Sequence, residues 1–394
     1  MRVVVAHNRY RSAQPSGENR IVDTEIEQLS AAGVEVIPFL RSSDDIPAMP
    51  VTGKALLPVS PLWNPGAARE LAALIRARRP DVLHLHNPYP LLSPWLIRTA
   101  HRHGLPVVHT VHNYRQVCAS GIYYREIGIC HDCRGRWLGV PAVAHRCYRG
   151  SRAQSAVMAV TLAAHRPTWR SVDRFIALTA AIATHLQEYG VPADRIVVKP
   201  NAVPDPGPPA PLGDGFLFAS GRLVPEKGLS LLLEAWRRHP EGALGTLRIA
   251  GDGPQRPLAE QAAADRTDVV YLGPLDPAGV RAAMRDSAVV LATPVWHDVL
   301  PTVVIEALAA GRPVLGTALG GIPYLVGDTG WTVPPEPAAL AEALPVARRD
   351  AAVRSDAARA RYLATFHPDV VTRQLIEVYQ GLGQPAAGYR RRVR

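Results

Sequence analysis

The sequence predicts an α/β fold built from two domains, each with a parallel sheet covered by helices. The chain of 394 residues exceeds the size at which a single hydrophobic core stops growing. Apolar runs of strand length alternate with segments of helical spacing along the whole chain. A stretch with five prolines in eight residues, 204–211, separates two such series and is typical of a stiff linker.

In the first series, short runs rich in Val, Ile and Leu precede segments whose apolar residues recur at three- and four-residue spacing. Gly33 follows one of these segments directly, as expected at a helix C-terminus. We expect strands at residues 3–6, 34–39, 81–86, 106–112, 174–179 and 196–201, and helices at 21–32, 67–78, 94–103 and 181–189.

The second series begins after the linker, with strands expected at 216–220 and 247–250 and a helix starting at Leu229. A last amphipathic segment, 366–382, predicts a final helix. We therefore divide the chain into a first domain, a second domain and a C-terminal helix with a basic tail. Their boundaries are 1–205, 206–365 and 366–394.

Composition restricts the class of protein. Hydrophobic residues make up 47% and charged residues 20% of the chain, as in globular proteins. No apolar run reaches the roughly 20 residues that a membrane span needs. The N-terminus reads as a strand rather than as a signal peptide, so we expect a cytoplasmic protein.

Positive charge is concentrated in the first domain. Residues 1–205 hold 24 basic and 15 acidic residues, whereas residues 206–394 hold 20 and 19. An Arg-rich solvated surface explains this, and so does an anionic membrane or a phosphorylated lipid acceptor. Nucleic acid is the least favoured partner and is not expected. The basic tail at 390–394 is expected to be disordered.

Two carboxylates eight positions apart, Asp298 and Glu306, mark the most informative stretch. Asp298 lies in an expected loop with Leu300, Pro301 and Thr302, and Glu306 lies among strong helix formers. Pro301 suits a helix start because its missing N–H would be unsatisfied there anyway. The loop would present free backbone N–H groups to an anion. An ordinary helix start with a capping acid is the alternative.

A second motif, Gly-Arg-Leu-Val-Pro-Glu-Lys-Gly at 221–228, follows the expected strand 216–220. Gly221 allows the backbone to turn and to approach a ligand closely. Arg222 offers a planar fork and Lys227 a compact charge, and both suit phosphate. The motif therefore predicts a phosphate cradle, with a surface turn as the alternative.

Together the two motifs, about 75 residues apart, resemble the signatures of the family-4 glycosyltransferases, retaining enzymes that take a sugar from a nucleotide-sugar. The resemblance implies the glycosyltransferase-B (GT-B) fold, with two Rossmann-like domains facing a cleft and a final helix that crosses back to the first domain. It implies that Arg222 and Lys227 hold the donor diphosphate, that Asp298 touches donor-sugar hydroxyls and that Glu306 binds the ribose. The family usually has Glu where this chain has Asp298.

His112 stands at the carboxyl end of the expected strand 106–112, where open α/β sheets bind ligands. By the same resemblance it meets the donor sugar, and a structural histidine is the alternative. His86 and Asn87, at the end of the preceding strand, are expected on the acceptor side. The loop after the first strand is implied to approach the diphosphate, and Gly17 is its match to the paired glycines of the family.

All four cysteines fall in one stretch with the spacing C-x11-C-x2-C-x13-C, in an insertion expected at about 116–150. They are Cys118, Cys130, Cys133 and Cys147. Because disulfides are rare in the cytosol and four thiolates suit tetrahedral Zn2+, we predict a structural zinc site that folds this insertion. His131 and His145 are alternative ligands. Buried free thiols or a redox pair are the other interpretations.

We therefore predict a retaining glycosyltransferase of the hexosyltransferase type. Its donor would be a UDP- or GDP-linked sugar, and its acceptor a glycan, a glycolipid or a small metabolite. No catalytic metal is expected, because four cysteines leave no open position for water and no Asp-x-Asp motif lies near either signature. Arg222, Lys227 and the amides of 299–302 would stabilise the leaving diphosphate, while Asp298 and His112 fix the sugar. The alternatives are a non-catalytic nucleotide-sugar-binding protein, an epimerase of the same fold, and a zinc-dependent nucleic-acid binder.

Overall fold

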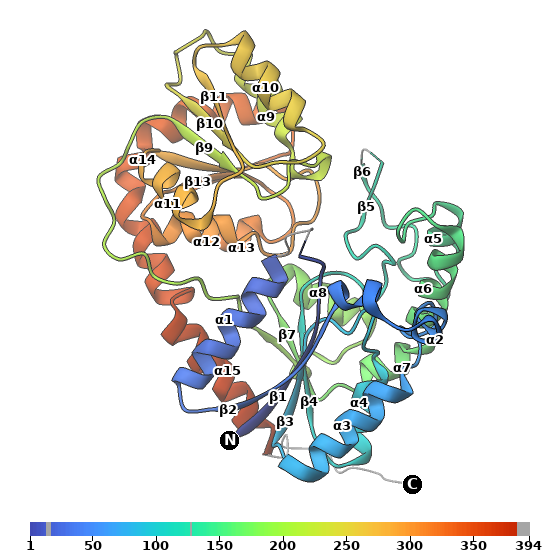
Figure 1. Ribbon diagram of the computed structural model, residues 1–394. Helices are drawn as coiled ribbons and strands as arrows, with labels where there is room; N and C mark the ends of the chain where they lie inside the picture. The colour runs from blue at the N-terminus through green and yellow to red at the C-terminus, as the bar shows by residue number, and fades with distance from the viewer. Residues whose placement is uncertain (13–16, 127, 384–394) are drawn as a thin grey trace.

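The computed structural model describes residues 1–12, 17–126 and 128–383, and it forms two halves stacked one above the other (Figure 1). Each half has a six-stranded sheet, and every pair of neighbouring strands in it is parallel. The predicted α/β fold with two parallel sheets is confirmed. The basic tail at 390–394 and residues 13–16 of the loop after the first strand lie outside the described residues.

The first sheet has the strand order β2-β1-β3-β4-β7-β8. Its central strands β3 and β4 are entirely buried, because helices cover both faces of a parallel sheet. The strands are β1 (Arg2–Arg9), β2 (Glu35–Ser42), β3 (Val82–Leu85), β4 (Val107–Val111), β7 (Arg174–Ala177) and β8 (Ile196–Val198).

The helices of the first half begin where the sequence supplies caps. The side chains of Asn64 and Thr179 accept hydrogen bonds from the first turns of α3 and α8. The helix α1 begins at Gly17, four residues earlier than predicted, and α2 was not predicted. The helical elements are α1 (Gly17–Ala31), η1 (Ser43–Ala48), α2 (Val51–Leu56), α3 (Pro65–Arg78), α4 (Trp95–Arg102), α6 (Arg152–Ala164), α7 (Arg166–Arg170), α8 (Ala180–Tyr189) and η2 (Ala193–Arg195).

The second sheet has the order β11-β10-β9-β12-β13-β14, and its central strands are also buried throughout. The strands are β9 (Phe216–Ala219), β10 (Leu247–Ala250), β11 (Val269–Gly273), β12 (Val289–Ala292), β13 (Val314–Thr317) and β14 (Trp331–Val333). The helical elements are η3 (Pro225–Lys227), α9 (Leu229–Trp236), α10 (Arg256–Asp265), α11 (Pro277–Arg285), α12 (Thr302–Ala309), α13 (Ile322–Val326) and α14 (Pro337–Thr365).

The cysteine-containing segment leaves the first sheet after β4 and returns at α6. It holds a short antiparallel pair, β5 (Tyr124–Arg125) and β6 (Gly128–Ile129), and the helix α5 (Val140–Ala144). Tyr114 and Tyr123 anchor it, because both rings are buried in the first core and lie 4.7 Å apart. In Figure 1 the β5–β6 pair projects from the first half toward the second.

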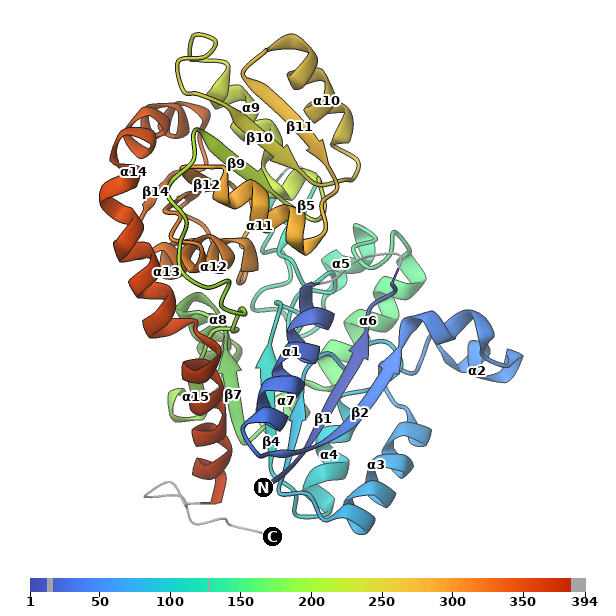
Figure 2. The same ribbon diagram turned by 60° about the vertical axis from the view of Figure 1, so that its left-hand side comes forward.

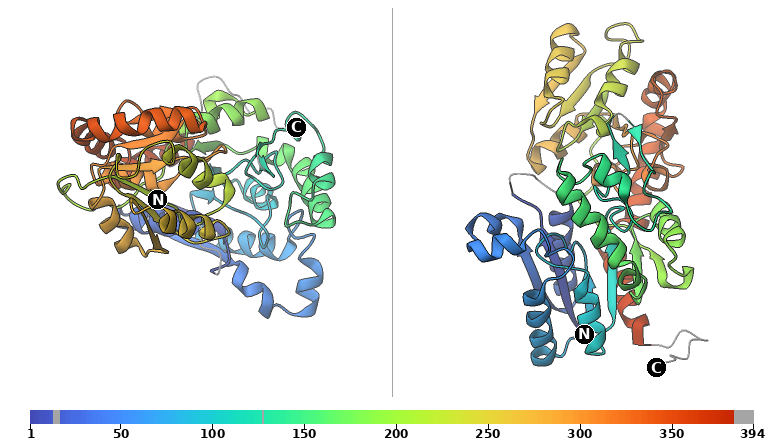
Figure 3. Two further views of the ribbon diagram at one scale, coloured as in Figure 1. Left: turned by 90° about the horizontal axis from the view of Figure 1, so that it is seen from above. Right: turned by 90° about the vertical axis from the view of Figure 1, so that its right-hand side faces the viewer.

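Two connections join the halves. The linker at 204–211 is clasped to the second half by Arg312, which is fully buried and donates to carbonyl oxygens of the linker and of α11. The long helix α14 then runs back along one side of the molecule, and α15 (Pro368–Gln380) lies against α1 of the first half (Figures 2 and 3). The turn η4 (Gly381–Gly383) follows it.

The helix α14 is the longest described helix at 29 residues, and the sequence prediction does not include it. Its charged residues and Pro345 give no apolar run. No helix among the described residues is both long and apolar enough to cross a bilayer.

Candidate functional site

The residues singled out by the sequence follow the carboxyl ends of strands at the centres of the two sheets. In the second sheet β9 lies between β10 and β12. The strands that follow β9 in sequence are therefore added first on one side of it and later on the other. Such a switch point opens a crevice where parallel α/β sheets bind ligands. Arg222 and Lys227 follow β9, and Asp298 follows β12, so the two motifs meet at this crevice.

The loop after β9 is shaped by glycines that no other residue could replace. Gly228 has φ +77°, and a Cβ there would lie 1.8 Å from the carbonyl oxygen of Thr293. Gly251 approaches Ser220 in the same way, at 1.9 Å. Gly221, by contrast, has nothing within 4 Å of a Cβ position, and Arg222 beside it is exposed. The loop is therefore packed against neighbouring backbone at Gly228 and open at Gly221 and Arg222.

The two motifs are joined by an ion pair. The ammonium Nζ of Lys227 lies 2.5 Å from Oδ2 of Asp298, and the side chains are 24% and 11% exposed. The same ammonium lies over the ring of Trp296 at 5.6 Å. An ammonium has three donors, and one of them is directed at Asp298. The contact links the predicted phosphate-binding lysine to the predicted sugar-binding carboxylate.

A second pair of glycines holds the loop that carries Asp298. The N–H of Gly321 donates to the carbonyl oxygen of Asp298 at 2.7 Å. A Cβ on Gly320 would lie 2.3 Å from that oxygen, and a Cβ on Gly321 would lie 2.1 Å from the oxygen of Val299. This close packing leaves the backbone at Asp298 little freedom to move.

The loop continues into α12. Leu300 is buried, Pro301 occupies the N-cap and Thr302 is the first helical residue. The first N–H groups of a helix have no acceptor within it, as the anion-site prediction requires. Glu306 lies one turn further and is partly exposed. Desolvation of its carboxylate raises its pKa, against the opposing effect of Arg20 and Arg281. The helix start at Pro301 agrees with the sequence expectation.

The first half contributes a buried histidine-rich edge. Nε2 of His112 lies 2.9 Å from Nδ1 of His86, with the rings stacked at 5.2 Å. His112 remains partly exposed, whereas His86 and Asn87 are buried. Burial, which disfavours the charged ring, lowers the pKa of His112 well below its usual value, so its imidazole is neutral. Gly17 is the first residue of α1, with open space around it.

The four cysteines are all partly exposed and form no disulfide. Burial, with a smaller contribution from the thiols of the other three cysteines, raises the pKa of the Cys133 thiol to about 11. Their sulfur atoms are nevertheless not drawn to metal-binding distance. In the described part of the chain, the one group of three or more metal-ligating side chains within 4.8 Å of one another is Glu25, His84 and His86.

Ring contacts that the sequence motifs do not indicate cross between the two halves. The ring of His131, from the cysteine segment, lies 5.5 Å from that of His297, and Tyr114 lies 6.5 Å from the same ring. After burial itself, the charge of Asp298 contributes to raising the pKa of Tyr114. Tyr114 follows His112 by two residues and could have been proposed from that position, whereas the sequence marks His131 only as an alternative zinc ligand.

Two family descriptions match the chain. The glycosyl transferase 4-like domain matches residues 16–202, and the glycosyl transferases group 1 domain matches residues 215–347. The boundary between them falls in the proline-rich linker.

Curated relatives match over most of the chain. A phosphatidyl-myo-inositol mannosyltransferase of Mycobacterium leprae is 28% identical over 389 residues, which cover 93% of each protein. A D-inositol 3-phosphate glycosyltransferase of Frankia alni is 29% identical over 348 residues, covering 76% of this chain and 77% of the relative.

Among solved structures, Anabaena HepE in complex with UDP has a TM-score of 0.66 at 17% identity, covering 97% of this chain and all of that chain. Its complex with UDP-glucose has a TM-score of 0.63 at 16% identity, again covering 97% and 100%. At this identity the likeness concerns the fold, which is the arrangement of two facing α/β domains found here.

Proposed function

We propose that this chain, which belongs to the family-4 glycosyltransferases of the GT-B fold and is a hexosyltransferase, transfers a hexose from a nucleoside diphosphate sugar to a hydroxyl with retention at the anomeric carbon. The observation that carries the proposal is the contact of Lys227 with Asp298. It joins a phosphate-binding group to a sugar-binding group at the switch point of the second sheet, opposite His112 of the first half.

The donor is a nucleoside diphosphate sugar for two reasons. Arg222 is exposed at the mouth of the loop after β9, and the unused donors of the Lys227 ammonium can bind phosphate oxygens. HepE, with the same fold, has been seen with UDP and with UDP-glucose. Glu306, in the middle of α12, would bind the ribose. UDP-linked and GDP-linked sugars both suit this arrangement.

In the proposed reaction the bond between the anomeric carbon and the diphosphate oxygen breaks, and its electron pair leaves with the diphosphate. The acceptor oxygen bonds to the anomeric carbon on the same face, and its proton passes to the leaving phosphate oxygen. Arg222 and Lys227 stabilise the charge that develops on the diphosphate, assisted by the first amides of α12. Asp298 and His112 hold the sugar hydroxyls, so no catalytic metal is required.

The acceptor is a hydroxyl of a glycolipid precursor. The two curated relatives are named for a phosphatidyl-myo-inositol and an inositol phosphate acceptor, both anionic cyclitols. The excess of basic residues in the first half suits an anionic acceptor and peripheral contact with an anionic membrane at its cytoplasmic face. A neutral glycan or small metabolite is the competing acceptor.

A donor and acceptor panel tests this function. Purified full-length protein is incubated with UDP-glucose, UDP-N-acetylglucosamine or GDP-mannose in EDTA, with phosphatidylinositol micelles, inositol phosphate or no acceptor. We expect transfer from one donor and an axial-to-axial or equatorial-to-equatorial relation between donor and product by NMR. Binding of a nucleotide-sugar with neither transfer nor hydrolysis would identify a non-catalytic binding protein, and conversion without an acceptor would identify an epimerase.

We also propose that the four cysteines hold one structural Zn2+, because their donor set fits a tetrahedral site and because neighbouring cysteines contribute to raising the pKa of the Cys133 and Cys147 thiols. Bound zinc would stabilise the thiolates and order a segment that has only a few core side chains of its own. Metal analysis of untagged protein should find about one zinc per chain. Cys130→Ser should lower folding yield while UDP binding persists. Metal-free protein with four titratable thiols and normal stability would refute the site.

A further inference from the structure

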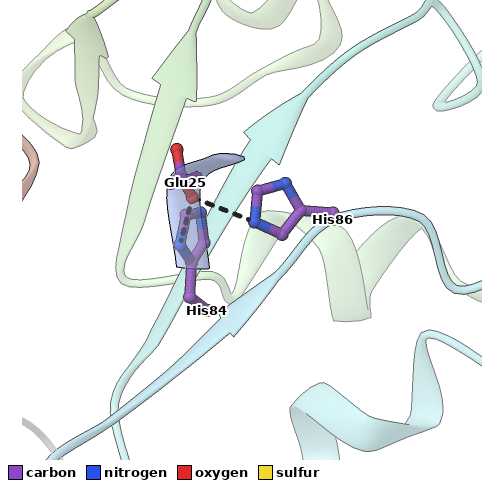
Figure 4. Close-up of side chains that lie close together, drawn as sticks. All are labelled: Glu25, His84 and His86. Atoms are coloured by element: carbon purple, nitrogen blue, oxygen red, sulfur yellow. Dashed lines mark ion pairs between the residues drawn. The ribbon is translucent and has the colours of Figure 1, made fainter. Parts of the chain in front are cut away.

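A buried cluster of charged and imidazole groups lies directly behind His112. The carboxylate of Glu25, on α1, has Oε1 3.3 Å from Nδ1 of His84 and 3.2 Å from Nε2 of His86 (Figure 4). Its Oε2 lies 3.5 Å from Nζ of Lys199. Because Nδ1 of His86 contacts His112, a continuous chain of contacts runs from Lys199 through Glu25 and His86 to the cleft.

The charges in this cluster define which atoms carry protons. Burial alone would raise the pKa of Glu25, but Lys199, His84 and His86 together hold it below its usual value, so the carboxylate is ionised and can only accept. Oε1 of Glu25 and Nε2 of His86 are both buried and have no hydrogen-bond partner among the described residues, and each has the other as a neighbour at 3.2 Å. The nitrogen that faces an ionised carboxylate must therefore carry a proton.

Charge balance then determines the state of His86. Lys199, 1% exposed, already supplies one positive charge to the Glu25 carboxylate. A charged His86 would place a second buried cation at the same carboxylate, so the balanced arrangement gives His86 a single proton, on Nε2. Its Nδ1 can only accept, and Nε2 of His112 must donate. The remaining nitrogen of His112, Nδ1, is left as an acceptor.

We propose that Glu25 is a positioning residue for His112: acting through His86, it fixes His112 in the Nε2-protonated tautomer, so that Nδ1 accepts a hydrogen bond from a donor-sugar hydroxyl. The sugar contact rests on the proposed function, whereas the tautomer does not. A carboxylate that orients an imidazole in this way is a general device for fixing a tautomer. Here it operates through one intervening histidine.

A divalent cation held by Glu25, His84 and His86 is the competing explanation, since their ligand atoms converge. The surrounding contacts favour the chain of protein contacts over a metal site. Nδ1 of His84 also contacts the hydroxyl of Tyr379 from α15 at 2.7 Å, and Nε2 of His84 contacts Thr110 at 2.8 Å, so both ring nitrogens of His84 already have protein partners. The Lys199 ammonium would also repel a cation bound to the same carboxylate.

Histidine 15N spectroscopy tests the proposal on the full chain at pH 7.5 without donor. Long-range proton–nitrogen correlations distinguish protonated from bare ring nitrogens, and His86→Gln and His112→Gln assign the signals. We expect both rings to carry the proton on Nε2. The paired variant Glu25→Gln with Lys199→Met removes both charges together and should mix the two tautomers of His112. It should lower kcat at least about tenfold, while UDP affinity stays unchanged.

A matched control removes a different buried ion pair, Arg266 with Asp268, as Arg266→Met with Asp268→Asn; it should change neither the spectrum of His112 nor kcat. A proton on Nδ1 of His112, two protons on His86, or tautomers unaffected by the paired variant would each overturn the proposal. So would stoichiometric metal whose removal shifts the His86 signals. Expected tautomers in a protein that turns over no donor would instead sink the proposed function, and with it the catalytic part of the proposal.

Discussion

The carboxyl-terminal edges of the two sheets differ in how they place their charged residues. The edge of the second sheet carries its cations on open, glycine-shaped loops, with Arg222 exposed and the side chain of Lys227 24% exposed. The edge of the first sheet encloses its cation, because the side chain of Lys199 is 1% exposed and is paired with Glu25 behind His86. Arg222 on the second edge can contact an incoming ligand, whereas Glu25 and Lys199 on the first edge pair with each other.

The difference indicates a division of labour. A diphosphate arrives with its own charge and can replace water and part of an exposed ion pair at modest cost. A sugar hydroxyl is neutral and needs a hydrogen-bonding group that is already oriented. The open edge therefore suits the charged part of the donor, and the buried edge suits the neutral part. Variants that remove charge from each edge should reveal the contrast.

The largest effect is expected at the buried edge, from Lys199→Met. The change leaves the Glu25 carboxylate buried without its ammonium, which should lower the free energy of unfolding by about 3–5 kcal/mol. Denaturant titration at pH 7.5 measures it. The paired variant Lys199→Met with Glu25→Gln should recover most of the loss, because no uncompensated charge remains. Equal stability of the single and paired variants would show that the charges at this edge are not coupled.

Sequence reasoning predicted the open edge far better than the buried one. Residues 221–228 and 297–306 are local motifs in which a strand end, glycines and charges are adjacent in the chain. Their ligand-binding chemistry can therefore be predicted from the sequence without knowledge of the fold. Glu25 and Lys199 are separated by 174 positions, and Tyr379 and His84 by 295. Only the fold brings such residues together, and no pattern within either segment specifies the partner.

The Lys227–Asp298 contact could not be predicted for a related reason. The sequence assigned both residues to one ligand, and each was expected to face it. The two opposite charges instead satisfy each other, which two separate motifs do not reveal. Under the proposed function, Asp298 has two partners in turn, first Lys227 and then the sugar.

At the open edge, Asp298→Asn should lower turnover roughly 100-fold or more, because the carboxylate contact matters most as charge develops on the sugar. UDP affinity should be kept or increased, since Lys227 loses a competing anion. Steady-state kinetics and calorimetry separate the two effects. Asp298→Glu should also lose activity, because Gly320 and Gly321 hold the loop too closely for a longer side chain. Wild-type turnover in Asp298→Glu would contradict this geometric argument.

The phosphate assignment predicts somewhat smaller effects on binding. Arg222→Ala and Lys227→Ala should each weaken UDP binding in EDTA by about 1.5–3 kcal/mol. Lys227→Ala should cost more, because it also leaves Asp298 as an unpaired anion beside the phosphates. The paired variant Lys227→Ala with Asp298→Asn should regain that difference. The control is Arg237→Ala, which changes an exposed arginine at the end of α9. Unchanged UDP affinity in both Arg222→Ala and Lys227→Ala would show that these residues do not bind the phosphates.

The smallest predicted effect is a pH dependence carried by the buried edge. Burial, which disfavours the charged ring, lowers the pKa of His109 to about 3, whereas an unfolded histidine titrates near pH 6.5. Below about pH 6.5 the unfolded chain takes up a proton that the folded chain refuses, so stability is full above that pH and falls as the solution is acidified. Each such histidine contributes about 1.4 kcal/mol per pH unit.

The variant His109→Asn tests this, because the Asn amide can still donate to the carbonyl oxygen of Leu85 that His109 Nδ1 contacts at 2.9 Å. In this variant the slope of the unfolding free energy between pH 6 and 5 should decrease by about 1.4 kcal/mol per pH unit. The exposed His103, changed to Asn, should leave the slope as it is. If both variants keep the wild-type slope in urea titrations, His109 does not remain neutral in the fold, and the buried edge differs less from the open one than its burial indicates.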